Sequence, residues 1–249
     1  MITRAKSNPK TTKQRGIQPL ADSNLVVLPA LLALQSDIAS CTICPSLKPW
    51  RKFGPEVYGH ASTGYLLVGE APGYVSWRKR RRFTGQAGML IRRALGTVGH
   101  PRYRDLEDLF YMTDIVKCHP AASANPSSNR SPRRVEVEAC SSYLLRELQV
   151  LRPSAIVTFG KAAAESVTRA IKQATEPVES SCLTGQAGDR SSASRCMGQT
   201  EVIPFPHPSP RNQVTILKQY PSMRAFEEVI ARTFRQLIAR LEAPKGREA

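Results

Sequence analysis

Residues 65–73 read Tyr65-Leu66-Leu67-Val68-Gly69-Glu70-Ala71-Pro72-Gly73, and this stretch decides the fold. A short apolar run that ends in a segment rich in glycine and proline is typical of a strand buried in a parallel sheet. Three later runs have the same character: Phe110–Val116, Ala155–Phe159 and Val202–Phe205. Because helical patterns separate the four runs, we predict an α/β fold in which helices cover both faces of a parallel sheet.

Apolar residues recur at the helical period in five segments. These segments are Leu25–Ser40, Ala87–Val98, Arg134–Leu151, Gly160–Lys172 and about Ser222–Leu241. Together with the strands they predict one folded domain over residues 24–242. Residues 1–23 are basic and lack periodicity, which predicts a disordered arm, and residues 243–249 are predicted to form a tail. Residues 173–200 are rich in Ser, Thr and Gly, which predicts a flexible insertion within the domain.

Polar loops follow three of the four predicted strands. The first strand ends in residues 69–73, the second leads into Asp114 and residues 117–120, and the fourth leads into residues 207–210. Ligands of parallel α/β sheets bind beyond the carboxyl ends of the strands. We therefore expect these three loops to meet at one edge of the sheet and to form a binding site.

The charge balance points to a polyanionic partner. The chain has 36 Lys and Arg against 20 Asp and Glu, which gives a net charge of +16. Such an excess favours nucleic acid, because contacts with phosphates release condensed counterions. A basic tail on an otherwise neutral enzyme would give the same total.

The six cysteines are the other unusual feature of the composition. No apolar run approaches the ~18–20 residues that span a bilayer, and the basic leader is too long for a typical signal peptide. We therefore expect a cytoplasmic protein, away from membranes, with reduced thiols. Cys41-x-x-Cys44 is a chelating pair that suits zinc, an iron–sulphur cluster or a redox role. Cys118 and Cys140 each lie singly, which disfavours a zinc ribbon with two such pairs.

Seven motifs follow one another in an order that resembles a known family. They are Cys41-x-x-Cys44, Gly69-Glu70-Ala71-Pro72-Gly73, Phe83-Thr84-Gly85-Gln86-Ala87-Gly88, Lys117-Cys118-x-Pro120, Asn129-Arg130-x-Pro132, Cys140 and His207-Pro208. Over roughly residues 38–240 the chain resembles the uracil-DNA glycosylase superfamily, in particular its iron–sulphur branch of the family-four type. The ordered set is far more specific than any single motif.

The resemblance implies a three-layer α/β/α sandwich around a four-stranded parallel sheet. It also implies a 4Fe–4S cluster on Cys41, Cys44, Cys118 and Cys140. The implied activity is hydrolysis of the bond between uracil and deoxyribose in DNA, which leaves an abasic site. Glycosidic hydrolysis needs no electron transfer, so we expect the cluster to act as a structural clamp. We expect a monomer, with DNA that holds uracil or another deaminated base as its partner.

Roles for individual residues follow from the resemblance. A flipped base would meet the backbone of residues 69–73 and stack on Phe83, while His207 would stabilise negative charge on its O2. The predicted substrate-binding residues are Gly69, Glu70, Ala71, Gly73, Phe83, Asp114 and His207, and the predicted catalytic residues are Glu70, Asp114 and His207. The predicted DNA-binding residues are Arg78, Lys79, Arg80, Arg81 and Arg82, together with Ser209 and Arg211 beside Pro210.

Two positions depart from the family pattern. Residues 74–77 lack the acidic residues that the family usually carries there, so Glu70 and Asp114 remain as candidates to activate water. Asp114 also stands where the family places Asn. An ionised Asp only accepts hydrogen bonds, so Asp114 could be protonated, could serve as the base, or could select another substrate. We hypothesise broadened specificity, with uracil as the leading substrate. The alternative function is a non-catalytic iron–sulphur protein that binds damaged or single-stranded DNA.

Overall fold

The computed structural model describes residues 24–50, 58–122, 125–175 and 200–243. The predicted arm at residues 1–23, most of the predicted insertion and nearly all of the predicted tail lie outside these ranges. The prediction for the insertion is wrong at its beginning, because Gln173–Thr175 continue the preceding helix.

Four strands form one sheet in which every neighbouring pair is parallel, as predicted. They are β1 (Tyr65–Gly69), β2 (Tyr111–Asp114), β3 (Ala155–Phe159) and β4 (Glu201–Phe205), in the order β2-β1-β3-β4. Strand β2 is shorter than its apolar run. Beyond the end of β2, the amides of Ile115 and Val116 donate to the carbonyls of Gly69 and Glu70, both at 3.0 Å. The β1 and β2 loops are thereby joined directly beyond the sheet.

The predicted helices are present, with bounds that differ by up to three residues. They are α1 (Asn24–Ser40), α3 (Gln86–Gly96), α5 (Arg134–Leu151), α6 (Lys161–Thr175) and α9 (Met223–Glu242). Shorter helical segments, which are too short to show a period, are η1 (Pro45–Trp50), α2 (Tyr74–Lys79), α4 (Leu106–Leu109), η3 (Pro210–Asn212) and α8 (Gln213–Leu217).

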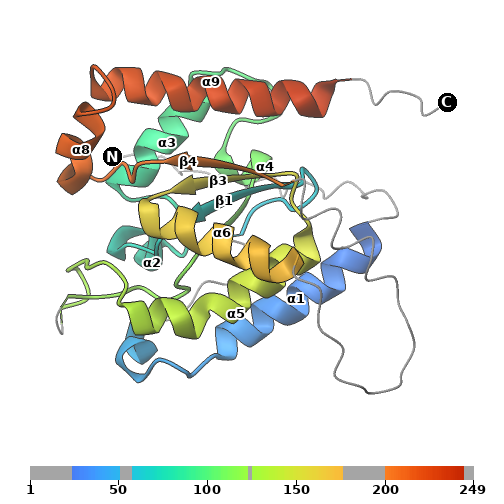
Figure 1. Ribbon diagram of the computed structural model, residues 1–249, viewed down its shortest axis with the longest axis vertical. Coiled ribbons are helices and arrows are strands. Elements are labelled where there is room, and N and C mark those ends of the chain that lie inside the picture. The colour runs from blue at the N-terminus through green and yellow to red at the C-terminus, as the bar shows by residue number, and fades with distance from the viewer. Residues whose placement is uncertain (1–23, 51–57, 123–124, 176–199, 244–249) are drawn as a thin grey trace, which may run out of the picture.

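The helices form two layers, one on each face of the sheet (Figure 1). Helices α3 and α9 pack on one face, where Tyr65 and Leu67 of β1 join their apolar side chains. Helices α5 and α6 pack on the other face with Leu66 and Val68, and α1 packs outside α5. Because β1 is apolar on both sides, it is buried along its whole length. The three-layer α/β/α sandwich is therefore confirmed.

No helix among the described residues is long and apolar enough to cross a membrane.

Candidate functional site

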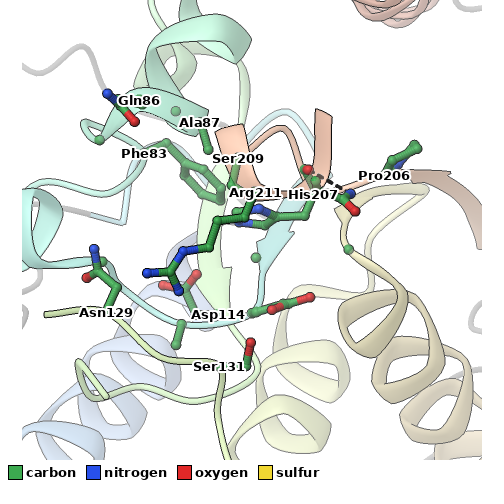
Figure 2. Close-up of a pocket in the computed structure, with 18 of the residues that line it drawn as sticks. Phe83, Gln86, Ala87, Asp114, Asn129, Ser131, Pro206, His207, Ser209 and Arg211 are labelled. Atoms are coloured by element: carbon green, nitrogen blue, oxygen red, sulfur yellow. Dashed lines mark hydrogen bonds between the residues drawn. The ribbon is translucent and has the colours of Figure 1, made fainter. Parts of the chain in front are cut away.

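The carboxyl ends of the strands open into a cavity of about 1070 Å³. The loops after β1, β2 and β4 all line it, as predicted, and Gly160 and Lys161 after β3 complete the wall. The lining includes each residue predicted to bind the base, namely Gly69, Glu70, Ala71, Gly73, Phe83, Asp114 and His207. Figure 2 shows Phe83, Asp114 and His207 pointing into this shared space.

Gly69 allows three parts of the cavity to come into contact. It pairs in register with Asp114 on the neighbouring strand. A Cβ atom at Gly69 would lie 2.5 Å from Oδ1 of Asp114 and 3.2 Å from Cζ of Phe83. Any side chain there would push the carboxylate and the aromatic ring apart. The end of β1 is therefore glycine because the floor of the cavity is packed against its backbone.

Phe83 occupies a strained backbone conformation, with φ of 53°. The following helix packs closely on it, since a Cβ at Gly88 would lie 2.1 Å from the carbonyl carbon of Phe83. Arg92 of α3 holds the strained segment in place. Its Nε donates to the Phe83 carbonyl at 2.9 Å and its Nη2 donates to the Arg82 carbonyl at 2.7 Å.

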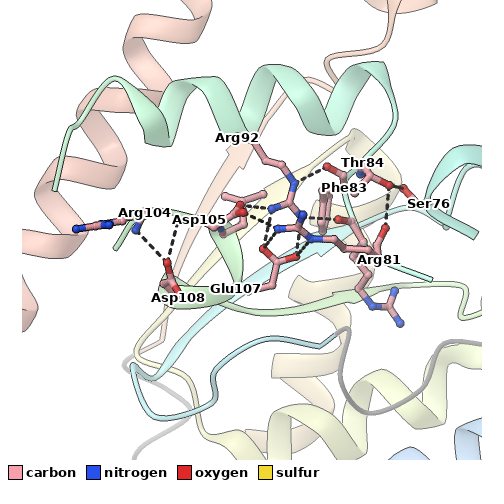
Figure 3. A network of polar contacts seen from close by, with 11 residues as sticks. Ser76, Arg81, Phe83, Thr84, Arg92, Arg104, Asp105, Glu107 and Asp108 are labelled. Atoms are coloured by element: carbon pink, nitrogen blue, oxygen red, sulfur yellow. Dashed lines mark hydrogen bonds and ion pairs between the residues drawn. The ribbon is translucent and has the colours of Figure 1, made fainter. Parts of the chain in front are cut away.

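Arg92 is in turn fixed by carboxylates near α4 (Figure 3). Its guanidinium donates to both oxygens of Glu107, at 2.7 and 2.8 Å, and to Oδ1 of Asp105. Arg81 binds the same two carboxylates, with Glu107 at 2.7 and 3.0 Å and Asp105 at 2.5 Å. Burial alone would raise the pKa of Glu107, but the hydrogen bonds from Arg92 and Arg81 lower that pKa to about 2. The network was not predicted, since its members share no sequence pattern.

Asp114 forms a buried ion pair with Arg82. The Arg82 residue is 1% exposed, Asp114 is 4% exposed, and Nη1 of Arg82 donates to Oδ2 of Asp114. The Arg82 guanidinium also lies over the ring of Tyr58, 4.8 Å from its centroid. Burial raises the pKa of the Asp114 carboxyl, and the cations of Arg82 and Lys117 oppose that rise. Burial on its own would lower the pKa of Arg82, but the negative charge of Asp114 raises it, so the guanidinium stays charged.

The predicted DNA-binding run therefore splits in two. Arg78, Lys79 and Arg80 are exposed at the end of α2. The prediction that Arg82 binds DNA is wrong, because its guanidinium is buried against Asp114 and Tyr58. The Arg81 side chain is 45% exposed and is already paired with two carboxylates.

A second buried ion pair supports the backbone of Asp114. The ammonium of Lys117 donates to Glu147 of α5 at 2.6 Å, to the hydroxyl of Thr113 at 2.7 Å and to the Asp114 carbonyl at 2.7 Å. Both charged side chains are almost fully buried. Breaking such a pair costs about 3–5 kcal/mol, because one charge is left unbalanced. Helix α5 thus fixes the end of β2.

Glu70 lies partly buried on the opposite side of the cavity floor. A Cβ at Gly160 would lie 2.4 Å from its Oε1, so the carboxylate rests against the backbone at the end of β3. Gly160 has φ of 107°, a conformation that side chains other than hydrogen rarely permit. Burial raises the pKa of Glu70, and the negative charge of Asp114 adds to the rise.

The loop after β4 supplies the upper wall of the cavity. Burial lowers the pKa of His207, so its imidazole is neutral at pH 7. The carbonyl of His207 accepts from Nδ2 of Asn212 at 3.0 Å, which closes the turn around Ser209. Arg211 is exposed and lines the mouth of the cavity (Figure 2).

Residues 129–132 form a further wall of the cavity, which was not assigned a role from the sequence. Oδ1 of Asn129 accepts from the amide of Tyr74 at 2.8 Å, and the ring of His119 bridges the carbonyls of Pro72 and Pro126 at 2.9 and 2.7 Å. These contacts attach the wall to the loop after β1. The signal that could have found it is the motif Asn129-Arg130-x-Pro132, already part of the resemblance.

Comparison with known proteins decides the family. The model of the family described as "Uracil DNA glycosylase superfamily" matches residues 56–231, which include every cavity loop described above. The chain belongs to this superfamily.

Three curated relatives show how far the likeness extends. A type-4 uracil-DNA glycosylase of Pyrobaculum aerophilum is 34% identical over 159 residues, which cover 63% of this chain and 75% of the relative. A type-4 uracil-DNA glycosylase of Archaeoglobus fulgidus is 37% identical over 131 residues, 53% of this chain and 60% of the relative. A type-5 uracil-DNA glycosylase of Pyrobaculum aerophilum is 30% identical over 200 residues, 70% and 80% of the respective chains.

The four cysteines predicted to bind a cluster all lie among the described residues. All four are outside any disulfide. Cys41 packs beside Tyr143 of α5, the helix that also carries Cys140. Cys44 and Cys118 pack against the same apolar cluster as Cys140. Within the ranges that the structure describes, however, no three His, Cys, Asp or Glu side chains are arranged to hold a metal ion. Cys182 and Cys196 lie outside those ranges.

Proposed function

We propose that this member of the superfamily hydrolyses the N-glycosidic bond of uracil in DNA and leaves an abasic site. One observation carries the proposal: an aromatic ring, a carboxylate oxygen and strand-end backbone meet at Gly69. A flipped base needs a stacking surface and polar groups along its edge, and this arrangement offers both. The printed names of the relatives support uracil as the substrate.

In the proposed binding mode, the base lies along the backbone of residues 69–73 and stacks on Phe83. The strained conformation of Phe83 and its hydrogen bond from Arg92 set the position of the ring before the base arrives. Asp114 meets the edge of the base farthest from the sugar. A preorganised site of this kind avoids reorganisation during the reaction.

In the proposed reaction, the bond between C1′ of the sugar and N1 of uracil breaks while water adds to C1′. The electron pair of the broken bond stays on the base, and the neutral imidazole of His207 donates a hydrogen bond to the developing charge on O2. In this binding mode Glu70 accepts a proton from the attacking water, because Asp114 meets the edge of the base farthest from C1′. Glu70 is the better candidate for the base, since the ion pair with Arg82 already occupies one oxygen of Asp114.

The proposed DNA contacts lie around the mouth of the cavity. Arg78, Lys79 and Arg80 on one side and Ser209 and Arg211 on the other would contact backbone phosphates and the minor groove. The exposed positions of Arg78, Lys79, Arg80 and Arg211 support this assignment.

A 4Fe–4S cluster on Cys41, Cys44, Cys118 and Cys140 is also proposed. Four thiols outside disulfides suit the thiolate ligation of such a cluster. Cys140 lies on α5, and Cys41 packs beside Tyr143 of the same helix. The cluster would supply a covalent link between the segment after α1 and the loop after β2, not a chemical step. Iron analysis and broad absorbance near ~400 nm test this assignment; a colourless protein that contains zinc would contradict it.

The activity is tested with a labelled oligonucleotide that contains one uracil. After incubation with the protein and then with alkali, we expect strand cleavage at the uracil position in both the single strand and the duplex. The same oligonucleotide with thymine is the control. Tight binding without cleavage would contradict the proposal and favour a non-catalytic DNA-binding protein.

A further inference from the structure

The two oxygens of Asp114 have different surroundings. Oδ2 accepts from Nη1 of Arg82. Oδ1 lies against the backbone of Gly69, beside the ring of Phe83, where the base would stack. Oδ2 is therefore held by a buried cation, while Oδ1 lies at the Gly69 end of β1, beside the ring of Phe83 in the cavity lining.

Arg82 is fixed on several sides. Its guanidinium is buried over the ring of Tyr58, and its backbone carbonyl accepts a hydrogen bond from Arg92 at 2.7 Å. Moving Arg82 to a DNA phosphate would leave Asp114 as a buried and unbalanced charge. The guanidinium is thus a permanent part of the cavity floor.

The charges below the cavity balance. Arg82 and Lys117 are cations, and Asp114 and Glu147 are carboxylates, with each cation paired to one carboxylate. An ionised carboxylate between two cations only accepts hydrogen bonds. A neutral acid or an amide would offer both a donor and an acceptor to the base. The presence of Arg82 therefore determines which edge of a base Asp114 can bind.

We infer that Arg82 is a positioning residue that determines substrate specificity, because it leaves Oδ1 of Asp114 as an acceptor for a ring N–H of the flipped base. This inference rests on the proposed function. Uracil presents such a hydrogen at N3, whereas the N3 of cytosine carries a lone pair that would face the carboxylate. Deamination of cytosine creates this hydrogen, so the cavity recognises the atom that distinguishes the damaged base. Hypoxanthine gains a ring N–H at N1 in the same way when adenine is deaminated.

The test compares single-turnover excision of uracil, 3-methyluracil, 4-thiouracil and cytosine from otherwise identical oligonucleotides. For the wild type we expect 3-methyluracil to react at least 10–100-fold more slowly than uracil, which is about the effect of removing one hydrogen bond to a charged group. Replacement of O4 by sulphur should change the rate less than about threefold, since Oδ1 does not bind O4. Cytosine should remain intact.

Variants separate a specificity role from a structural one. Arg82→Met should slow uracil excision at least tenfold, because it unbalances Asp114. The double variant Arg82→Met/Asp114→Asn removes both charges and should recover most of the uracil rate. The double variant should also excise 4-thiouracil more slowly than uracil, because the amide introduced at position 114 would donate to O4 and sulphur is a weaker acceptor. Arg93→Met, on the exposed side of α3, is the matched control and should keep the wild-type rates.

Each result bears on the inference. Equal rates on uracil and 3-methyluracil, or excision of cytosine, would overturn it even if Arg82→Met fails to fold. The inference would also be overturned if the double variant folds but does not recover the rate of uracil excision. The same holds if the double variant excises 4-thiouracil as fast as uracil. Uracil excision by the wild type in these cases would leave the proposed function intact. A wild type inactive on uracil would instead overturn the proposed function, and this inference with it.

Discussion

Arg78, Lys79 and Arg80 share a basic run with Arg81 and Arg82, but the two parts of the run have opposite surroundings. The first three lie exposed at the end of α2. The chain then turns at Arg80, whose φ is 49°, and the amide of Arg81 donates back to Ser76 at 3.1 Å. After this turn Arg81 and Arg82 point toward carboxylates of other segments.

The difference shows that equal charge in a run does not give equal function. A buried arginine is tolerated only where a carboxylate balances it. Asp114 of β2 balances Arg82, and Asp105 and Glu107 near α4 bind Arg81. The inner part of the run, Arg81 and Arg82, is therefore bound to carboxylates, and of these two only Arg82 lines the cavity. The outer part, Arg78, Lys79 and Arg80, remains available to phosphates.

The largest expected effect comes from the inner part. Arg82→Met should lower the free energy of unfolding by about 3–5 kcal/mol, since it leaves Asp114 buried without its cation. Urea unfolding followed by circular dichroism measures this change. Arg93→Met, at an exposed ion pair, should change the same quantity by less than about 1 kcal/mol. Equal effects of the two substitutions would contradict a buried ion pair between Arg82 and Asp114.

His207 lines the cavity as a neutral residue, so its replacement should affect the reaction and not the binding of phosphates. His207→Asn should slow uracil excision about 10²–10³-fold, the usual effect of removing one donor to a developing anion. The salt dependence of DNA binding should stay unchanged, because the neutral imidazole neutralises no phosphate. A variant that binds more weakly but reacts at the wild-type rate would place His207 at the DNA surface.

The dependence of the excision rate on pH tests whether His207 acts as a neutral imidazole. Its pKa is below the ordinary value of 6.5, so the imidazole is neutral at pH 7 and becomes charged only below pH 6.5. Because the pKa of His207 is lower in the folded protein, the unfolded chain binds this proton at a higher pH than the folded protein does. The free energy of unfolding therefore decreases as the pH falls below 6.5. The wild-type excision rate should be level from pH 8 to 6.5 and fall below that range. A decline that begins above pH 7 would contradict a neutral His207.

The outer part of the run is expected to affect binding alone. Replacement of Arg78, Lys79 and Arg80 by Ala should weaken duplex binding about 10-fold or more. It should also reduce the slope of log K against log salt by about 1 for each phosphate that the variant no longer neutralises. The excision rate at saturating enzyme should stay within about threefold of the wild type. An unchanged slope would mean that these residues form only a solvated loop.

The smallest effect is expected at Arg81. Its side chain is partly exposed, so Arg81→Ala should lower the free energy of unfolding by only about 0.2–1 kcal/mol. The salt slope should not change, because the charge of Arg81 is already shared between Asp105 and Glu107. Thermal unfolding and binding titrations check the two parts of this prediction. A slope that falls by about 1 would assign Arg81 to the outer part.

The sheet and the loops that line the cavity could be predicted from the sequence, but the ion pairs and hydrogen bonds between their side chains could not. The four apolar runs were sufficient for the sheet, and the carboxyl ends of parallel strands must meet at one edge, so the convergence of Gly69, Asp114 and His207 followed. The partner of Arg82 could not be predicted in this way. Arg82 and Asp114 are 32 residues apart, and a buried and a solvated arginine look alike in a basic run. For the same reason, the hydrogen bond from Arg92 to the carbonyl of Phe83 could not be predicted from the sequence.

We infer that Arg82 belongs to the cavity and not to the DNA surface. The most direct test is the salt dependence of duplex binding by Arg82→Met, measured together with its single-turnover excision of uracil. If Arg82 belongs to the cavity, the variant keeps the wild-type salt slope and its excision of uracil is slowed at least tenfold. A slope reduced by about 0.9, the value for one phosphate contact, with an unchanged excision rate would contradict it.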